Sequence, residues 1–236
     1  MSPFVCTRRN HANAGTGPNT RGAYGAGTAG PRGVAWGGGA NQRVAGRGSN
    51  AGCAGSPVDA NGVPLYFILM LALDQTGSIG IGGAQRGIEI VDTYGPRCVA
   101  IGLVSFGDAV VTHFAPTDPA TVRAFLEAAV AYGAIFDGGN PFFHDDGGDI
   151  AENGVDALAA ALAAHAGYSS PLPRLIFFKT DTQGFDHNIA APATVNAGLQ
   201  TLAGTWLEFG AAAGGTSYAA TFPPTAVVRH SGFPVL

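Results

Sequence analysis

The chain has 236 residues, 46% hydrophobic and 12% charged, which suits one sizeable domain with a buried core and a lightly charged surface. A net charge of -4 is too small to indicate nucleic-acid binding by the whole chain. The longest apolar run, residues 63–73, is too short to span a membrane. Residues 1–15 lack the apolar core of a signal peptide, so we expect a soluble protein without an encoded export route.

Charge is distributed unevenly along the chain. Residues 1–58 contain six arginines and no Asp or Glu, whereas the remainder contains all sixteen acidic residues. Residues 1–60 are also rich in glycine and show neither helical nor strand periodicity, so we treat them as a separate low-complexity arm. Such an arm is typical of a flexible linker, or of a segment ordered only against neighbouring subunits of an assembly.

The cysteines divide between the arm and the rest of the chain. Cys6 and Cys53 bracket the glycine-rich segment and could form a disulfide. Cys98 lies in the apolar run RCVAIGLVSFG and is predicted to be a buried free thiol.

From Pro64 onward, apolar stretches alternate with helical patterns. In chain order we expect a buried strand at 66–74, a helix at 80–95, a second buried strand at 97–107, a short strand at 109–114 and a helix at 118–133. The start of the second helix is well marked, because Asp118 suits the N-cap and Pro119 the first turn.

A long loop, 134–149, separates these elements from a second alternating half. There we expect a helix at 151–167, a strand at 174–181, a helix at 188–204 and a strand at 205–213. Prolines interrupt the chain after Gly215, so the closing helix is predicted to be shortened or absent. The alternation indicates an α/β fold over residues 61–236, with a doubly wound, mostly parallel central sheet and helices on both faces.

Carboxylates follow three separate elements of this predicted sheet. Asp74 ends the first strand, Asp181 ends a later one, and the long loop delivers Asp149 and Glu152 to the start of a helix. Because ligands bind at the carboxyl ends of parallel strands, these side chains are expected at one edge. Like charges that converge repel one another unless a cation neutralises them.

Two hydroxyls accompany Asp74 in the stretch LALDQTGSIG. If the chain stays extended, alternation points Asp74, Thr76 and Ser78 the same way, as a shared ion requires. Helix N-capping explains one hydroxyl, but it does not explain the carboxylates at the same edge. Carboxylate and hydroxyl oxygens suit Mg²⁺, and also Mn²⁺ or Ca²⁺, rather than zinc.

Four blocks in order resemble a known family. LDQTGS resembles the first element of the metal-ion-dependent adhesion site (MIDAS) of von Willebrand factor type A (vWA) domains, Asp-x-Ser/Thr-x-Ser. GLVSFGD, residues 102–108, is similar to the family's second strand and turn, and LIFFKTD to the strand that ends in the last metal-site Asp. GGDIAENGVDALAAAL, residues 147–162, is similar to the integrin-β and hemicentin-like branch.

The resemblance implies a role for each candidate ligand. Asp74 would hold the ion mostly through water, Thr76 and Ser78 would ligate it directly, Glu152 would occupy the glutamate position of that branch, and Asp181 would be an outer ligand. Asp149 would help to form a second cation site, although Ala151 replaces the usual proline there. The loop before Asp149 also carries Asp137, His144, Asp145 and Asp146, most of which we interpret as solvated loop residues.

Three other kinds of site fit the sequence less well. TGSIG is one residue away from the Gly-x-Ser-x-Gly elbow of a serine hydrolase, with Asp181 and His187 or His230 following, but this leaves Asp74 unexplained. A dinucleotide loop fails at Gln85, where glycine is required. The six histidines are scattered without His-x-x-x-His spacing, which argues against zinc.

The sequence and the resemblance together predict a non-enzymatic, divalent-metal-dependent module for adhesion or assembly. Its partner would be a protein that presents an acidic side chain to the ion, and neighbouring subunits would contact the arm. The alternative is a structural component of a larger particle, such as a virion or a tail appendage, that uses the fold as a scaffold. Either prediction favours an extracellular or virion-surface location.

Overall fold

Strand β2 (Phe67–Asp74) lies inside a six-stranded sheet, and all eight of its residues are buried. The computed structural model describes residues 58–144, 152–185, 188–211 and 216–234. The strand order is β4-β3-β2-β5-β7-β9. The other strands are β3 (Cys98–Phe106), β4 (Val110–Thr117), β5 (Arg174–Lys179), β7 (Gly204–Glu208) and β9 (Val228–Arg229).

All neighbouring strands in this sheet are parallel except β3 and β4, which form an antiparallel pair. After β2 the chain adds β3 and then β4 on one side, and later adds β5, β7 and β9 on the other. The direction of strand addition therefore reverses around β2. In an open parallel sheet this reversal creates a crevice at the carboxyl ends of the strands.

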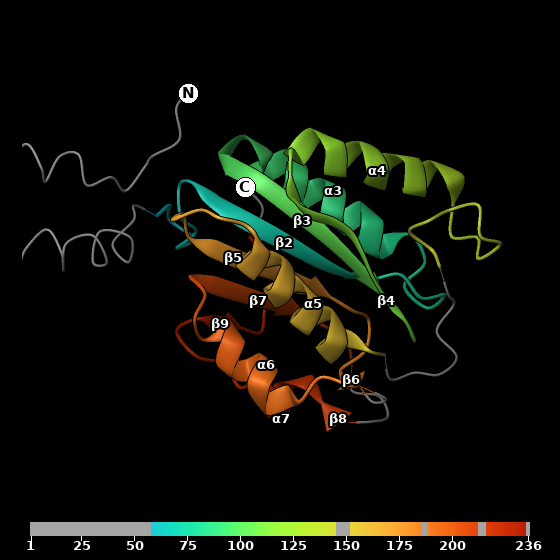
Figure 1. Cartoon of the computed structure of the whole chain (residues 1–236). Coiled ribbons are helices and arrows are strands. Elements are labelled where there is room, and N and C mark those ends of the chain that lie inside the picture. Colours follow the sequence, from blue (N-terminus) through green and yellow to red (C-terminus); the bar gives the residue numbers. More distant parts are fainter. Residues whose placement is uncertain (1–57, 145–151, 186–187, 212–215, 235–236) are drawn as a thin grey trace, which may run out of the picture. The chain divides into compact units, whose positions relative to one another are not determined.

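Helices cover both faces of the sheet (Figure 1). On one face lie α3 (Gly82–Tyr94) and α4 (Pro119–Tyr132). On the other face lie α5 (Gly154–Gly167), α6 (Pro192–Leu199) and the four-residue α7 (Tyr218–Thr221). Each face has its own apolar cluster, as expected when inward side chains alternate along buried strands.

The predicted doubly wound α/β fold is confirmed, and the predicted strands and helices all occur with shifted ends. The start of α4 is as predicted, because the Asp118 carboxylate accepts a hydrogen bond from the Thr121 N–H and Pro119 opens the helix. The predicted shortening of the closing helix agrees with the short α7. Strand β9, the short pair β6 (Gly184–Phe185) and β8 (Thr216–Ser217), and the 3₁₀ turn η1 (Gly95–Arg97) were not predicted.

The predictions about the cysteines and the arm can be compared with the structure only where it describes the residues concerned. Cys98 is a buried free thiol as expected, and burial raises its pKa. Cys6, Cys53 and the arm up to residue 57 lie outside the described residues, so arm-to-subunit contacts and a Cys6–Cys53 disulfide stay predictions. None of the helices in the described segments is long and apolar enough to cross a membrane.

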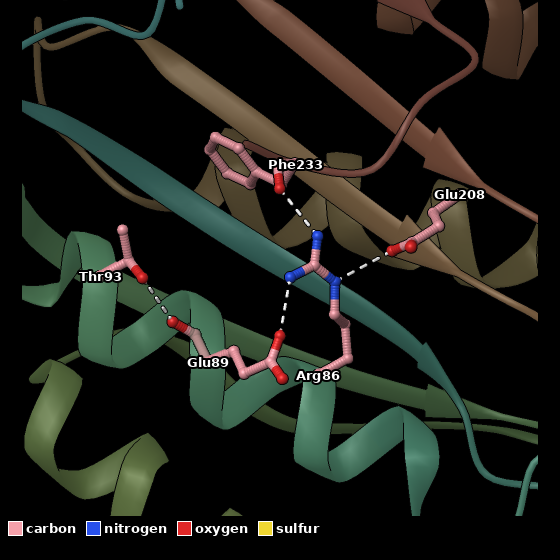
Figure 2. A network of polar contacts seen from close by, with 5 residues as sticks. All are labelled: Arg86, Glu89, Thr93, Glu208 and Phe233. Carbon is pink, nitrogen blue, oxygen red and sulfur yellow. Dashed lines mark hydrogen bonds and ion pairs between the residues drawn. The ribbon is translucent and has the colours of Figure 1, made fainter. Parts of the chain in front are cut away.

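The last described segment is fixed to helix α3 by Arg86, in a set of contacts that we name the Arg86 clamp (Figure 2). The Arg86 Nε donates to Glu208 Oε1 at 3.1 Å, Nη1 donates to Glu89 Oε1 at 3.0 Å, and Nη2 donates to the Phe233 carbonyl at 2.7 Å. The Phe233 ring stacks on Trp206 with centroids 4.6 Å apart. The clamp and this stack hold the segment after β9 against the α3 side of the core.

Candidate metal centre

Asp74 is the last residue of β2, and its side chain is completely buried. Its carboxylate accepts three hydrogen bonds. Thr76 donates to Oδ1 from its backbone N–H at 2.9 Å and from its hydroxyl at 2.7 Å, and the Thr180 hydroxyl donates to Oδ2 at 2.6 Å. Both oxygens of this buried carboxylate therefore have donors, as a buried acid requires.

The hydroxyls continue from this buried carboxylate to the surface. Thr76 Oγ1 lies 3.1 Å from Ser78 Oγ; Thr76 is 1% exposed, whereas Ser78 is exposed. The expectation of an extended loop is wrong, because the chain turns after Gln75 and the Gly80 N–H donates to the Thr76 carbonyl at 3.0 Å. The turn nevertheless brings the three predicted side chains of this stretch together.

The topology explains why Thr180 meets Asp74. β2 and β5 pair in parallel, with Leu73 opposite Lys179, so Asp74 and Thr180 come next on neighbouring strands at their carboxyl ends. This is the carboxyl edge at which strand addition reverses, the place where open parallel sheets generally bind ligands. Helix α3 packs closely above, since a Cβ on Gly83 would lie 2.2 Å from the Asp74 carbonyl oxygen.

Asp181 follows Thr180 directly and is partly exposed. The pKa of Asp74 is raised mainly by burial, and the negative charge of Asp181 raises it further, whereas the hydrogen bonds from Thr180 and Thr76 oppose this shift. The two carboxylates thus interact across the strand ends. A cation at this edge would favour the ionised form of Asp74.

The structure positions Glu152 through its backbone. The Asn153 N–H donates to the Gly107 carbonyl at 3.1 Å, and the Asn153 side-chain amide donates to the Asp108 carbonyl. This β3–β4 turn follows Phe106, which is paired with Asp74 in the sheet. Glu152 is 2% exposed and enters α5 beside the same edge, but its role as a ligand stays a prediction.

The loop residues have different outcomes. Asp149, Asp145, Asp146 and Ala151 lie outside the described residues, so the second cation site stays a prediction. Asp137 is an exposed loop acid as expected, and it accepts a hydrogen bond from the Gly139 N–H at 2.8 Å. His144 is not simply solvated, because its Nε2 lies 3.0 Å from Ser105 Oγ.

Thr180 is the residue of this cluster that the sequence analysis missed. In LIFFKTD the final Asp carries the resemblance, and the hydroxyl before it reads as an ordinary strand residue. Its position at the end of a strand next to β2 was the available signal, but it required knowledge of the β2–β5 register.

The donor set fits a hard divalent cation, because carboxylate and hydroxyl oxygens are the ligands that Mg²⁺, Mn²⁺ and Ca²⁺ favour. Within the described residues, no three His, Cys, Asp or Glu side chains gather in a metal-binding arrangement, so hydroxyls would have to complete the site. The serine hydrolase alternative stays a prediction, because His187 lies outside the described residues. Ser78 contacts the Thr76 hydroxyl, and the His230 Nε2 lies 2.6 Å from the Phe222 carbonyl oxygen.

No protein-family model and no curated protein matches the chain. Among solved structures it is similar to an aerotolerance-related membrane protein from Bacteroides fragilis, with 17% identity, TM-score 0.40 and coverage of 61% of this chain and 66% of that one. It is also similar to a structure of proximal thread matrix protein 1 from the mussel byssus, in which that protein has a zinc-occupied MIDAS motif. The identity is 14% and the TM-score 0.43, and the match covers 67% of this chain and 46% of that one. A third is a von Willebrand factor type A protein from Catenulispora acidiphila (11% identity, TM-score 0.39, coverage 62% and 34%).

The chain thus spans less than two thirds of the length of each of these three proteins. Their identities and TM-scores are too low to support any argument about the site. The assignment of the fold rests on the strand order, the parallel register and the helices on both faces.

Proposed function

We propose that the chain is a non-enzymatic protein-binding module that holds a divalent cation at the carboxyl edge of its sheet and captures a carboxylate of a partner protein. One observation carries this proposal. Asp74 is fully buried where strand addition reverses, and a line of hydroxyls runs from it through Thr76 to the exposed Ser78. Such a line provides oxygen ligands from the interior to solvent.

Each side chain of the cluster has a defined part in this proposal. The Thr76 hydroxyl donates its only proton to Asp74, so Ser78 is the donor in the 3.1 Å contact between the two hydroxyls. One lone pair of Thr76 accepts from Ser78, and the other is left for a cation. Thr180 holds the other Asp74 oxygen and thereby fixes the orientation of the carboxylate.

Asp74, Thr76 and Ser78 would hold the ion, with Glu152 and Asp181 as the remaining candidates. When bound, Mg²⁺, Mn²⁺ or Ca²⁺ would supply a positive charge to which the partner's carboxylate bonds. The exposed end of the line, at Ser78, is where a partner would approach.

Calorimetric titration of the full chain with Mg²⁺, Mn²⁺ and Ca²⁺ tests the cation site. We expect binding by the wild type and a loss of affinity of about 100-fold or more in Asp74→Ala. Asp108→Ala is the matched control, because Asp108 is an exposed acid at the same edge and should leave the affinity within about threefold. Equal affinity of Asp74→Ala and wild type, with both proteins folded by circular dichroism, contradicts the assignment.

A second experiment tests carboxylate capture. A random peptide display library is bound to the full chain in Mg²⁺ and eluted with a chelator. Peptides enriched in Asp or Glu are expected from the wild type and not from Asp74→Ala. Elution of peptides without acidic enrichment would leave a cation site but remove the proposed partner chemistry.

A further inference from the structure

Two histidines from different segments converge on one buried serine. Ser105, on β3, is completely buried, and its Oγ lies 2.7 Å from His113 Nε2 and 3.0 Å from His144 Nε2. His113 lies on β4 and His144 at the end of the described part of the long loop. The two imidazole centroids are 6.4 Å apart, so both Nε2 atoms point into the same small region.

This imidazole cluster lies on a different face from Asp74. Ser105 is opposite Leu73 in the β2–β3 register, and Leu73 belongs to the apolar cluster under α3 and α4. Asp74 is opposite Phe106, which belongs to the cluster under α5. Because successive side chains of a strand point to opposite faces, the imidazoles and the Asp74 carboxylate form separate clusters.

The surroundings keep His113 in its neutral form. Its ring packs near Phe125 and Phe142, with centroids 4.9 Å and 6.0 Å away. Burial lowers the pKa of His113 to about 4, and the nearby His144 lowers it as well. A neutral imidazole keeps a nitrogen lone pair, which is the form that binds transition metals.

If only hydrogen bonds hold this cluster, the two imidazoles must play different parts. The Ser105 hydroxyl has one proton, so it can donate to only one of the two Nε2 atoms and must accept from the other. The two histidines then need different tautomers. A metal ion instead accepts lone pairs from both Nε2 atoms, with the two imidazoles in the same tautomer.

We propose that His113 and His144 form a two-imidazole site for a borderline divalent transition metal, represented by Zn²⁺, with Ser105 beside it. Both histidines are partly exposed, so water can reach the remaining coordination positions. Imidazole nitrogens select zinc and copper, whereas the oxygen cluster at Asp74 selects magnesium or calcium. This site is independent of the proposed partner-binding function. Sequence spacing does not reveal this site, because the two histidines are far apart in the chain. They come together only through the β3–β4 pairing and the long loop.

Zinc titration of the full chain in excess Mg²⁺ tests the site, since Mg²⁺ occupies oxygen sites and leaves the imidazoles available. We expect His144→Asn to lower zinc affinity at least about tenfold. His230→Asn, which changes a histidine bonded to a backbone carbonyl, and Asp74→Ala should both retain zinc binding. Unchanged zinc affinity in His144→Asn overturns the proposal and leaves the cluster as a hydrogen-bonded serine.

A measurement on the wild type decides the question without any variant. Imidazole ¹⁵N NMR follows each ring nitrogen during zinc addition. Zinc should move the Nε2 resonances of both His113 and His144 at one equivalent. Movement at other histidines, with these two unchanged, overturns the proposal.

Discussion

Two buried hydroxyl clusters lie at the ends of the neighbouring strands β2 and β3, and they differ in the ionisable group that they contain. In one cluster burial raises the pKa of Asp74, and in the other it lowers the pKa of His113. The cause is the same, because a low-dielectric interior disfavours the charged form of either group. The consequence is opposite for binding. A protonated carboxyl loses its capacity as an anionic ligand, whereas a neutral imidazole keeps its lone pair.

The comparison teaches what each cluster needs in order to hold an ion. Asp74 depends on donors that favour its ionised form, and Thr76 and Thr180 supply them. His113 needs only apolar neighbours, here Phe125 and Phe142, to stay neutral and keep its lone pair. The oxygen cluster should therefore be sensitive to changes in its surroundings, and the imidazole cluster less so.

The largest effect is expected at Gly83, which packs against the Asp74 carbonyl. A change there should affect the oxygen cluster and leave the imidazole cluster intact. In Gly83→Ala the new Cβ would meet that backbone oxygen at 2.2 Å, so helix or strand must move. We expect the free energy of unfolding in urea to fall by about 3 kcal/mol or more. Cation affinity at Asp74 should fall, while zinc affinity at the histidines persists.

Gly82→Ala is the matched control for this change. Its Cβ would meet only Ile79 Cγ1, at an ordinary 3.5 Å. Alanine is also the better helix former, so stability should stay within about 0.5 kcal/mol or rise. Equal losses in both variants would show that the contact with Asp74 is not the cause.

The next effect concerns a third imidazole, that of His165. It is buried beside a backbone carbonyl and no hydroxyl, so it shows what burial does to a histidine pKa without a hydroxyl partner. His165 is 2% exposed, its Nε2 lies 2.8 Å from the Leu175 carbonyl oxygen, and burial lowers its pKa from 6.5 to about 4. The unfolded chain therefore binds this proton more readily than the folded chain. Its contribution to stability is complete above about pH 6.5 and is lost as the pH falls towards about 4, by on the order of 3 kcal/mol.

His165→Gln keeps an N–H donor and removes the titration. Urea unfolding at a series of pH values should therefore show a shallower fall between pH 6.5 and 4 than in the wild type. Parallel curves for the two proteins would mean that His165 titrates normally in the folded state.

The smallest effect distinguishes the Thr180 hydroxyl, which donates to the Asp74 carboxylate, from the Thr205 hydroxyl, which does not. Thr180→Val removes the donor to Asp74 Oδ2 and should cost about 1–2 kcal/mol of the free energy of unfolding, with weaker cation binding. Thr205→Val is the control, because the buried Thr205 hydroxyl has no hydrogen-bond partner among the described residues. That variant should be neutral or more stable, and a loss equal to that of Thr180→Val would contradict the comparison.

Much of this arrangement could be predicted from local sequence. The apolar runs before Asp74 and Asp181 identify buried parallel strands, and their polar ends identify the carboxyl edge of the sheet, where a ligand site is predicted. Strand β9 could not be predicted, because two residues among prolines carry no periodicity and form a strand only by pairing with β7. The Thr180 bond and the imidazole pair depend on strand register, which a sequence pattern does not specify.

The aromatic contacts around Tyr94 have a consequence for how this unit is carried in a longer chain. The Tyr94 ring meets Phe67, the first residue of β2, at 6.1 Å and Phe233, in the last described segment, at 4.8 Å. The two ends of the folded unit thus meet at one ring, while Asp74 lies at the other end of β2. A domain whose ends meet in this way can be inserted into a loop of a host protein, with the Asp74 edge of its sheet away from the junction.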